Sequence, residues 1–298
     1  MGSLPVTGRR TSSCVQHTLS LCTTLSKRVR VSVLVVGMEY WDQHKKVPAA
    51  VWSRPASARG TFLRIISVND VYKLGNYPRV ATAVKAARAA AKDMDFVCIS
   101  TLPGDFLSPC ALTSLDGGRA MMKGLSIAQI DYACLGNHEL DLGFVGLESI
   151  LDSSSGTAIL NSNMDVHLQK LPKFATVSIG DRTAVLGGFL TDDISIYPPS
   201  TKPSLRSVSS ACIETWNAAK ASDSDHRTPD LFIPMTHQLT AMDRKTAVAL
   251  AQHDELKTRT PVILAGHDHE VFIEEAGQSV IVKVGADATN IGIVDIWW

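Results

Sequence analysis

The sequence predicts an α/β fold over residues 61–298, and three observations support it. Short apolar runs alternate with longer segments that favour helix, which is the pattern of strands connected by helices. Polar residues of the metal-ligand type follow several of the predicted strands. The chain has 298 residues, 45% of them hydrophobic, so it is long enough to bury a large core.

The first half of this region predicts strands connected by helices. Pro78 opens an alanine-rich segment that favours helix as far as Met94. Further helices are predicted over Gly118–Gln129 and from about Phe144 to Leu151. The strands are predicted at Phe62–Val68, Phe96–Ser100, Ile130–Leu135 and Thr157–Leu160. Such alternation favours a parallel sheet flanked by helices.

The second half begins with a predicted hairpin, whose turn is Gly180-Asp181. A helix is predicted at about Leu205–Ala221, and Asp243 is predicted to cap another helix that ends near His253. The predicted strands are Phe174–Ile179, Thr183–Phe189, Leu231–Pro234, Pro261–Leu264, Val271–Glu275, Ser279–Val284 and Ile291–Ile296. No internal repeat or linker divides residues 61–298, so we expect one domain.

Residues 1–60 differ in composition from the rest of the chain. They contain nine Lys and Arg residues against two acids, Glu39 and Asp42, and are rich in Ser and Thr. A basic, acid-poor leader is typical of an organelle transit peptide, with a disordered tail or a mis-assigned gene start as alternatives. Because the one apolar run, Val31–Gly37, is too short and too late for a secretory signal, we exclude the leader from the predicted fold.

Composition also limits the partners. The 238 residues after the leader hold 20 basic and 27 acidic groups, which argues against nucleic acid as a bulk partner. No apolar run approaches the roughly 18–20 residues that a membrane span requires. The six cysteines form no CxxC pair, so we expect reduced residues and favour an intracellular protein.

Five predicted strands end in residues that can bind metals. Carboxylate, amide oxygen and imidazole groups are ligands for borderline divalent ions such as Zn, Mn, Fe or Co. A single one would be read as a helix cap or a hydrogen-bonded loop residue, but five in succession indicate a shared site at the carboxyl edge of a sheet. The residues are Asp70, Asp105, Asn137 with His138, His237, and His267 with His269.

These residues lie in motifs whose order resembles that of the calcineurin-like metallophosphoesterases. GNHELDLG, together with the later THQ and AGHDH, most resembles the 5′-nucleotidase branch, and the resemblance covers roughly residues 62–296. It implies a four-layer sandwich in which two mixed β-sheets are flanked by helices. It also implies two divalent metal ions, of which Zn, Mn, Fe and Co are the candidates.

The resemblance further implies a role for each site residue. Asp105 would bridge the two ions. Asp70 and His269 would complete one metal site, and the other would be completed by Asn137, His237 and His267. His138 would face the phosphoryl group of the substrate, and Asp141 would orient it as a His–Asp dyad. Glu139 would either anchor this loop or lie exposed in a turn.

Two features depart from the family pattern. The first motif usually reads Asp-x-His, but here it is Asp70-x-Tyr72. Tyrosine is a poor ligand for a divalent ion and a good one for a trivalent ion such as Fe(III), so we expect the first metal site to lack one ligand. The second departure is length, because the chain ends at Trp298 where the metal domain should end. We expect the nucleotide-recognition domain of the branch to be missing, and Trp297 and Trp298 mark either a truncation or the end of a strand.

We therefore expect a hydrolase that acts on phosphomonoesters, with nucleotides as the leading substrate class. The nearest alternative is a phosphodiesterase acting on cyclic nucleotides or other diesters. A third hypothesis is a scaffold or binding protein that keeps the fold but holds its metals weakly, which Tyr72 favours. The fold alone does not decide between these activities.

Overall fold

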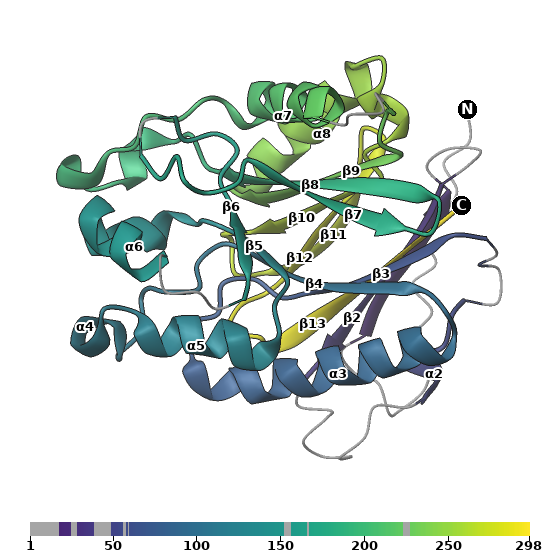
Figure 1. Ribbon diagram of the computed structural model, residues 1–298, viewed down its shortest axis with the longest axis horizontal. Helices are drawn as coiled ribbons and strands as arrows, with labels where there is room; N and C mark the ends of the chain where they lie inside the picture. Colours follow the sequence, from purple (N-terminus) through teal and green to yellow (C-terminus); the bar gives the residue numbers. More distant parts are fainter. Residues whose placement is uncertain are drawn as a thin grey trace.

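The computed structural model describes residues 18–24, 29–38, 49–55, 58, 60–151, 156–165, 167–222 and 227–298. Its strands form two mixed sheets that pack face to face, and helices cover the outer face of each (Figure 1). The helices α3 and α5 lie below the first sheet in that view, and α7 and α8 lie above the second. The predicted four-layer sandwich is confirmed.

Over the described residues the first sheet has seven strands, in the order β1-β2-β13-β3-β4-β5-β6. The strands β3 to β6 are parallel, whereas β13, β2 and β1 run antiparallel to their neighbours. Their bounds are β1 Thr18–Thr24, β2 Arg30–Gly37, β3 Phe62–Ser67, β4 Val97–Pro103, β5 Tyr132–Cys134, β6 Ala158–Leu160 and β13 Asn290–Trp297.

The second sheet has six strands over the described residues, in the order β11-β12-β10-β9-β8-β7. Its four inner strands are parallel, and the edge strands β7 and β11 are antiparallel to their neighbours. The bounds are β7 Phe174–Ile179, β8 Arg182–Leu190, β9 Leu231–His237, β10 Val262–Gly266, β11 Val271–Ala276 and β12 Ser279–Val284. Each sheet therefore has a parallel portion whose strands end at one common edge.

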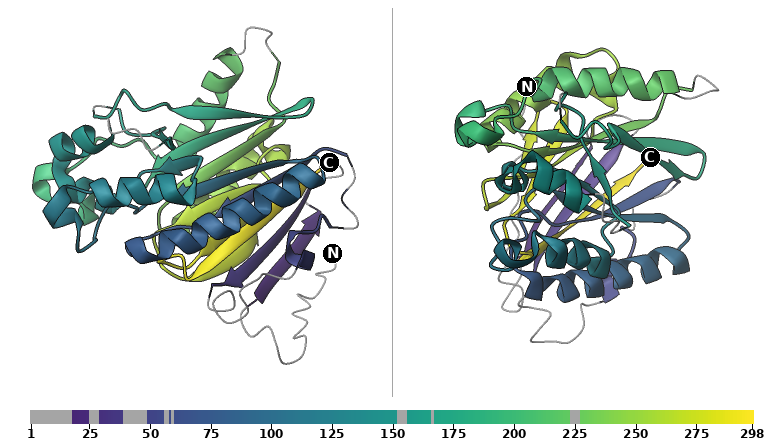
Figure 2. Two further views of the ribbon diagram at one scale, coloured as in Figure 1. Left: turned by 60° about the horizontal axis from the view of Figure 1, so that its bottom comes forward. Right: turned by 60° about the vertical axis from the view of Figure 1, so that its left-hand side comes forward.

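Helices connect the parallel strands and bury one face against a sheet. The left view of Figure 2 shows α3 lying across the outer face of the first sheet. The apolar face of α3 packs its buried residues Val80, Val84 and Ala87 in the core beneath that sheet. The helices are α2 Ala49–Trp52, α3 Tyr77–Asp93, α4 Thr113–Asp116, α5 Arg119–Ala128, α6 Gly143–Leu151, α7 Val208–Ser222 and α8 Thr240–Gln252. Short 3₁₀ turns are Leu74–Asn76, Asn137–Leu142, Ile194–Ile196, Pro199–Thr201 and Leu256–Thr258.

The core between the sheets is made by apolar side chains from both. Leu63 and Ile65 of β3 lie in one cluster with Ile233 of β9 and Leu264 of β10, and all four are 0% exposed. Burial of these side chains stabilises the fold by about 1.5–3 kcal/mol each, and it fixes the two sheets against each other. The strand ends that follow are therefore held on a rigid support.

The exclusion of residues 1–60 from the fold is wrong for part of that segment. The strand β2 pairs with β13 along its whole length, from Arg30 opposite Trp297 to Gly37 opposite Asn290. Val31 and Val33 of β2 are 0% exposed and belong to the core between the sheets. The basic composition of the segment obscures this valine-rich strand. Residues 1–17, 25–28 and 39–48 lie outside the described part of the chain, so the transit-peptide hypothesis stays a prediction.

Asp243 does not cap its helix as predicted. The helix α8 begins at Thr240, and Asp243 lies in its first turn with 0% of its surface exposed. Its Oδ1 accepts hydrogen bonds from Thr236 Oγ1 at 2.7 Å and from Gln238 Nε2 at 2.9 Å. Asp243 is thus a buried acceptor that ties α8 to the end of β9.

Among the described residues, none of the helices has the length and apolar character to cross a bilayer.

Candidate metal centre

The predicted site residues meet where the carboxyl edges of the two sheets adjoin. Asp70, Asp105 and Asn137 follow β3, β4 and β5 of the first sheet. His237 ends β9 of the second sheet, and His267 and His269 follow β10. The register of β9 and β10 sets His237 opposite Gly266, so His237 and His267 emerge side by side.

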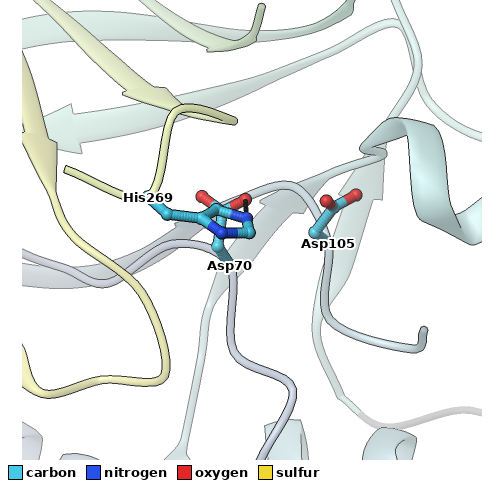
Figure 3. A group of neighbouring side chains, drawn as sticks. All are labelled: Asp70, Asp105 and His269. Carbon is cyan, nitrogen blue, oxygen red and sulfur yellow. Dashed lines mark ion pairs between the residues drawn. The ribbon is translucent and has the colours of Figure 1, made fainter. Parts of the chain in front are cut away.

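Asp70, Asp105 and His269 form a group that could hold a metal ion, with one ligand atom of each lying within 4.8 Å of the others (Figure 3). His269 Nε2 lies 3.3 Å from Asp70 Oδ1, and this contact raises the pKa of His269. The two aspartates are buried, whereas His269 is exposed. A pair of buried carboxylates with one exposed imidazole favours a cation that enters from solvent.

His237 lies against the same carboxylates from the other sheet. Its Nδ1 is 3.0 Å from the carbonyl oxygen of Pro103, and its buried Nε2 faces carboxylates without the geometry of a regular hydrogen bond. Nε2 lies 3.2 Å from Asp105 Oδ2 and 3.8 Å from Asp70 Oδ1. Burial lowers the pKa of His237, but Asp105 and Asp70 raise it to about 10, so this point favours a positive charge. A metal ion bound here would take the place of that proton.

Asn137 and His267 lie next to His237. Asn137 Oδ1 lies 3.0 Å from His267 Nδ1, and the ring centroids of His267 and His237 are 5.1 Å apart. Burial and the neighbouring His237 lower the pKa of His267 to about 4, so its imidazole is neutral at pH 7. Neutral imidazole is the form that binds a metal.

Asp105 connects these groups to the predicted dyad. Its Oδ1 accepts a hydrogen bond from the backbone N–H of His138 at 3.0 Å. Burial raises the pKa of Asp105, but His237 lowers it to about 2, so the carboxylate is charged. His138 Nδ1 lies 2.8 Å from Asp141 Oδ2, which also accepts a hydrogen bond from Ser108 Oγ at 2.9 Å. Both side chains of the dyad are partly exposed, so a substrate can reach them from solvent.

Tyr72 points its hydroxyl at Asp70, Asp105 and His269. The oxygen donates to Asp105 Oδ2 at 2.8 Å, lies 3.3 Å from Asp70 Oδ1, and is 2.8 Å from His269 Nε2. Burial, Asp105 and Asp70 all raise the pKa of Tyr72, so the phenol keeps its proton. A neutral phenol is a weak ligand for a divalent ion, but it stands at the position where the family pattern has histidine.

The backbone around the site is strained and closely packed. Asp70, Asp105, His267 and His269 all have positive φ, at 54°, 55°, 90° and 60°. Residues other than glycine adopt this region at a free-energy cost, and such residues cluster at functional sites. A side chain at Gly104 would collide with the ring of His237, so this glycine permits the close approach of β4 and β9.

Glu139 anchors the loops that carry Asp105 and His138, and the alternative of an exposed turn residue is wrong. Its side chain is 0% exposed. The carboxylate accepts four backbone N–H groups, from Asp105, Phe106, Leu107 and Gly136, at distances between 2.6 and 3.0 Å. Burial raises the pKa of Glu139, and the charge of Asp105 adds to this, while the N–H donors oppose it.

The structure gives several further residues a supporting role that sequence reasoning does not predict. Ser108 has no sequence context of a nucleophile, but its hydroxyl binds Asp141. Asn69 donates to Asp70 Oδ2 at 2.6 Å and accepts from the backbone N–H of Val284 at 2.9 Å, so it orients that aspartate. Lys283 is fully buried near His237 and His267. The available signal for Lys283 is a lysine inside the otherwise apolar run Ser279–Val284.

Comparison with known proteins gives matches in structure alone. The chain matches no protein-family model, and no curated protein matches its sequence. Among solved structures, the NAD nucleotidase NadN of Haemophilus influenzae is similar over 78% of this chain, with a TM-score of 0.65 and 15% identity. A 5′-nucleotidase precursor from Thermus thermophilus gives 0.62 and 15% over 78% of this chain. The calcineurin-like phosphoesterase YfkN from Bacillus subtilis gives 0.54 and 14%, also over 78%.

The match covers different fractions of the neighbours' own chains. This chain covers 47% of NadN and 51% of the Thermus protein, about half the length of each, and 90% of the YfkN chain. At these identities the comparison establishes the architecture and not the activity. The chain thus has the fold of the calcineurin-like phosphoesterases, and its resemblance to the 5′-nucleotidase branch is confirmed at the level of that fold.

Proposed function

We propose that this chain is a metal-dependent phosphoesterase that hydrolyses phosphomonoesters, with nucleotides as the leading substrate class. The observation that carries the proposal is the convergence of the two sheet edges on one group of ligands, with a His–Asp dyad beside it. Asp70, Asp105 and His269 form the group, and the backbone N–H of His138 is bonded to Asp105 itself. A fold alone supports many activities, so the activity is inferred from the residues of this site.

The residues fit a pair of divalent ions in their chemistry. Asp105 lies between the two proposed groups, because its Oδ2 is 3.2 Å from His237 Nε2 and 2.8 Å from the Tyr72 hydroxyl, so it could serve both ions. We assign Asp70 and His269 to one ion and Asn137, His237 and His267 to the other, in line with the resemblance. The position of His237 Nε2, buried 3.2 Å from Asp105 Oδ2 and 3.8 Å from Asp70 Oδ1, supports this assignment. Bound divalent ions would supply an activated water and neutralise phosphoryl charge.

His138 and Asp141 would then supply the proton that the leaving group requires. With Nδ1 directed at Asp141, His138 has Nε2 available for the substrate. Hydrolysis breaks the bond between phosphorus and the ester oxygen, and the leaving alkoxide requires a proton. The Asp141 carboxylate orients the imidazole, so His138 is placed to donate that proton or to stabilise charge on the phosphoryl oxygens. Ser108 holds Asp141 in place through its hydroxyl.

The choice of nucleotides rests on the neighbours. Two of them carry the names NAD nucleotidase and 5′-nucleotidase, and the motifs GNHELDLG and AGHDH resemble that branch. This chain spans about half of each of those proteins, so the substrate of the whole proteins comes to it only as part of this proposal. Cyclic nucleotides and other diesters are the alternative substrates that the assay should include.

A second candidate function is a scaffold that binds metals weakly, and Tyr72 favours it. The Tyr72 hydroxyl contacts Asp105, Asp70 and His269, so it takes up hydrogen-bonding capacity that the first metal ion would need. Metal content separates the two functions. A hydrolase of the proposed kind should hold nearly two ions per chain, and the scaffold less than one.

The test is phosphate release from 5′-AMP by the full chain with added Mn²⁺ or Zn²⁺, beside the variants His138→Ala and His253→Ala. His253 lies outside the site, at the end of α8, and serves as the matched histidine control. We expect metal-dependent release that falls about 10²-fold or more in His138→Ala, the usual range for loss of a general acid. The control should keep full activity, and a cyclic nucleotide assayed in parallel should release less product.

Three outcomes decide the matter. Full turnover by His138→Ala with its metals bound would contradict the assigned dyad. Faster cleavage of the cyclic nucleotide would favour the diesterase. Absence of both activities, in protein that holds less than one ion per chain, would favour the scaffold.

A further inference from the structure

A buried lysine lies directly behind the histidines of the metal centre. Lys283 belongs to β12, which pairs in parallel with β10, and its side chain is 0% exposed. The ammonium donates to the carbonyl oxygens of Gln238 at 2.7 Å and Gly266 at 2.8 Å, and to Asp268 Oδ2. All three of its N–H groups are therefore used. Asp243 Oδ2 lies 2.9 Å away and forms a further ion pair.

Each of the three hydrogen-bond acceptors adjoins a residue of the proposed metal site. Gln238 follows His237 in the chain, and Gly266 precedes His267. Asp268 lies between His267 and His269, and two of the three bonds of the ammonium go to backbone atoms of these loops. One cation thus joins the end of β9 to the end of β10, although these segments are far apart in sequence.

The two carboxylates extend the connection. Asp268 Oδ2 also accepts the backbone N–H of Thr240 at 3.0 Å and its hydroxyl at 2.8 Å, which closes the β10 loop onto the start of α8. Asp243 Oδ1 binds Thr236 and Gln238, on either side of His237. The side chains of the residues before and after His237 are therefore held by one carboxylate.

The loop that carries His267 and His269 needs such supporting contacts. His267 and His269 have left-handed backbone conformations, with φ of 90° and 60°, which persist only where surrounding contacts determine them. A buried charge is expensive to desolvate, so stability alone gives little reason to keep a lysine here. Both observations indicate that Lys283 holds the backbone of this loop in its conformation.

We propose that Lys283 is a positioning residue, which fixes the two loops so that His237, His267 and His269 present their nitrogens correctly to metal ions. The inference rests on the proposed function in one respect, because it takes these histidines as metal ligands. Lys283 contacts neither substrate nor metal in this scheme. It acts through the carbonyls of Gln238 and Gly266 and through Asp268.

The chain offers a matched control for a merely structural role. Arg64 is a buried cation in β3, with 1% of its side chain exposed. It binds Asp295 through two contacts of 2.7 Å and donates to the carbonyl oxygens of Trp52 and Ser53 at 2.7 and 3.2 Å. Arg64 thus has the same kinds of partner as Lys283, but it lies near the start of β3, whereas Asp70 follows the end of that strand.

The experiment is a titration of Co²⁺ into metal-free full-length chain, read by the visible absorption of the bound ion. The wild type is compared with Lys283→Met and Arg64→Met at a temperature at which circular dichroism shows all three folded. We expect Lys283→Met to weaken Co²⁺ binding by about 10–100-fold, the range for loss of a residue that orients metal ligands, and to change the absorption spectrum. Arg64→Met should lower the melting temperature but leave both the affinity and the spectrum as in the wild type.

A second variant keeps the test decisive if Lys283→Met does not fold. Asp268→Asn changes a partner that is 23% exposed and preserves its size, so we expect a folded protein whose Co²⁺ affinity falls in the same direction by a smaller factor. Unchanged affinity and spectrum in the folded variant would overturn the positioning role while leaving the proposed function intact. Equal losses of affinity in Lys283→Met and Arg64→Met would also overturn it. A wild type that binds no Co²⁺ would overturn both the inference and the proposed metal site.

Discussion

Tyr72 is the residue at which this site departs most from the family pattern. Its hydroxyl is within 2.8 Å of both Asp105 Oδ2 and His269 Nε2. Because burial and the two aspartates raise the pKa of Tyr72, the phenol donates a hydrogen bond where an imidazole would offer a lone pair. The metal content of the first site should therefore depend on this residue.

We predict that Tyr72→His increases the Mn²⁺ affinity of the weaker site by about tenfold or more, since even an outer partner of a metal ligand is worth about that much. The number of ions per chain should approach two, as measured by elemental analysis after gel filtration. Tyr72→Phe is the control, because it removes the hydroxyl without adding a ligand. A wild type that already holds two ions with equal affinity would contradict the prediction.

Glu139 illustrates a residue whose role is structural support of the site. A glutamine at this position has a single oxygen and an amide NH₂ group, so it would bring a donor against at least one of the four N–H groups. We predict that Glu139→Gln lowers the free energy of unfolding by about 2 kcal/mol, because a buried N–H group left without an acceptor costs about 1–3 kcal/mol.

Urea denaturation followed by circular dichroism measures this change. Glu148→Gln is the matched control, because Glu148 lies exposed on α6 and should change the unfolding free energy little. If the two substitutions destabilise the protein equally, Glu139 does not anchor the loops.

Residue identities at strand ends could be predicted from the sequence because the motifs are local. Asp70, Asp105, Asn137 and His237 each follow an apolar run within a few residues, so position and chemistry appear together. The support behind them could not be predicted in this way. Lys283 contacts Asp243 and Gln238 across long stretches of sequence, and only the folded arrangement of β9, β10 and β12 brings them together.

At the scale of elements, β2 is the one that sequence reasoning places outside the fold. Its pairing with β13 on one side and β1 on the other makes it an inner strand of the first sheet. The same leader also holds α2, where the carbonyl of Trp52 is bonded by Arg64. Residues 1–60 are basic in composition, but the charged residues around an apolar run do not determine whether that run pairs as a strand.

We predict that a chain beginning at residue 61 loses cooperative unfolding. Removal of β1 and β2 would leave the β13 edge unpaired and expose Val294 and Ile296, which are 0% exposed in the intact chain. An unpaired apolar edge is a site of aggregation. A chain beginning at residue 17 keeps every described strand and is the reference for the shorter chain.

Differential scanning calorimetry and gel filtration of the two truncated chains would check this. We expect soluble aggregates, or no sharp transition, for the shorter one. Val33→Ala in the full chain is a milder version of the same test. It should lower the free energy of unfolding by about 2 kcal/mol, because it removes two buried methyl groups and leaves a small cavity. A chain from residue 61 with the melting temperature of the full protein would show that β2 contributes nothing.

At the scale of the whole molecule, the site exists only because two sheets meet. The strand–helix alternation of the first half predicts parallel strands with a common edge, and β3 to β6 show that arrangement. The assignment of later strands to a second sheet comes from the family resemblance, since periodicity alone does not say which strands pair. The insertion of β13 beside β3, at the far end of the chain, is a pairing that no local pattern predicts.

Because the proposed ligands come from both sheets, metal binding should stabilise the molecule as a unit. A ligand that binds only the folded state adds about 2.7 kcal/mol to the free energy of unfolding when its concentration is 100 times its Kd. For a domain of this size that corresponds to a rise in melting temperature of about 5 °C. We predict such a rise when Zn²⁺ is added to metal-free full-length chain, and its reversal by a chelator.

The variants Asp105→Asn and Asp131→Asn distinguish a specific site from general binding of cations. Asp131 is a partly buried carboxylate paired with Arg88 at 2.7 Å, outside the metal centre. Its loss should lower the melting temperature of the metal-free protein and leave the Zn²⁺-dependent rise unchanged. Asp105→Asn should abolish the rise, because this carboxylate faces both groups of ligands. If the rise survives in Asp105→Asn, the stabilising ion binds elsewhere, and the assignment of the ligands from β3, β4, β9 and β10 to one centre is wrong.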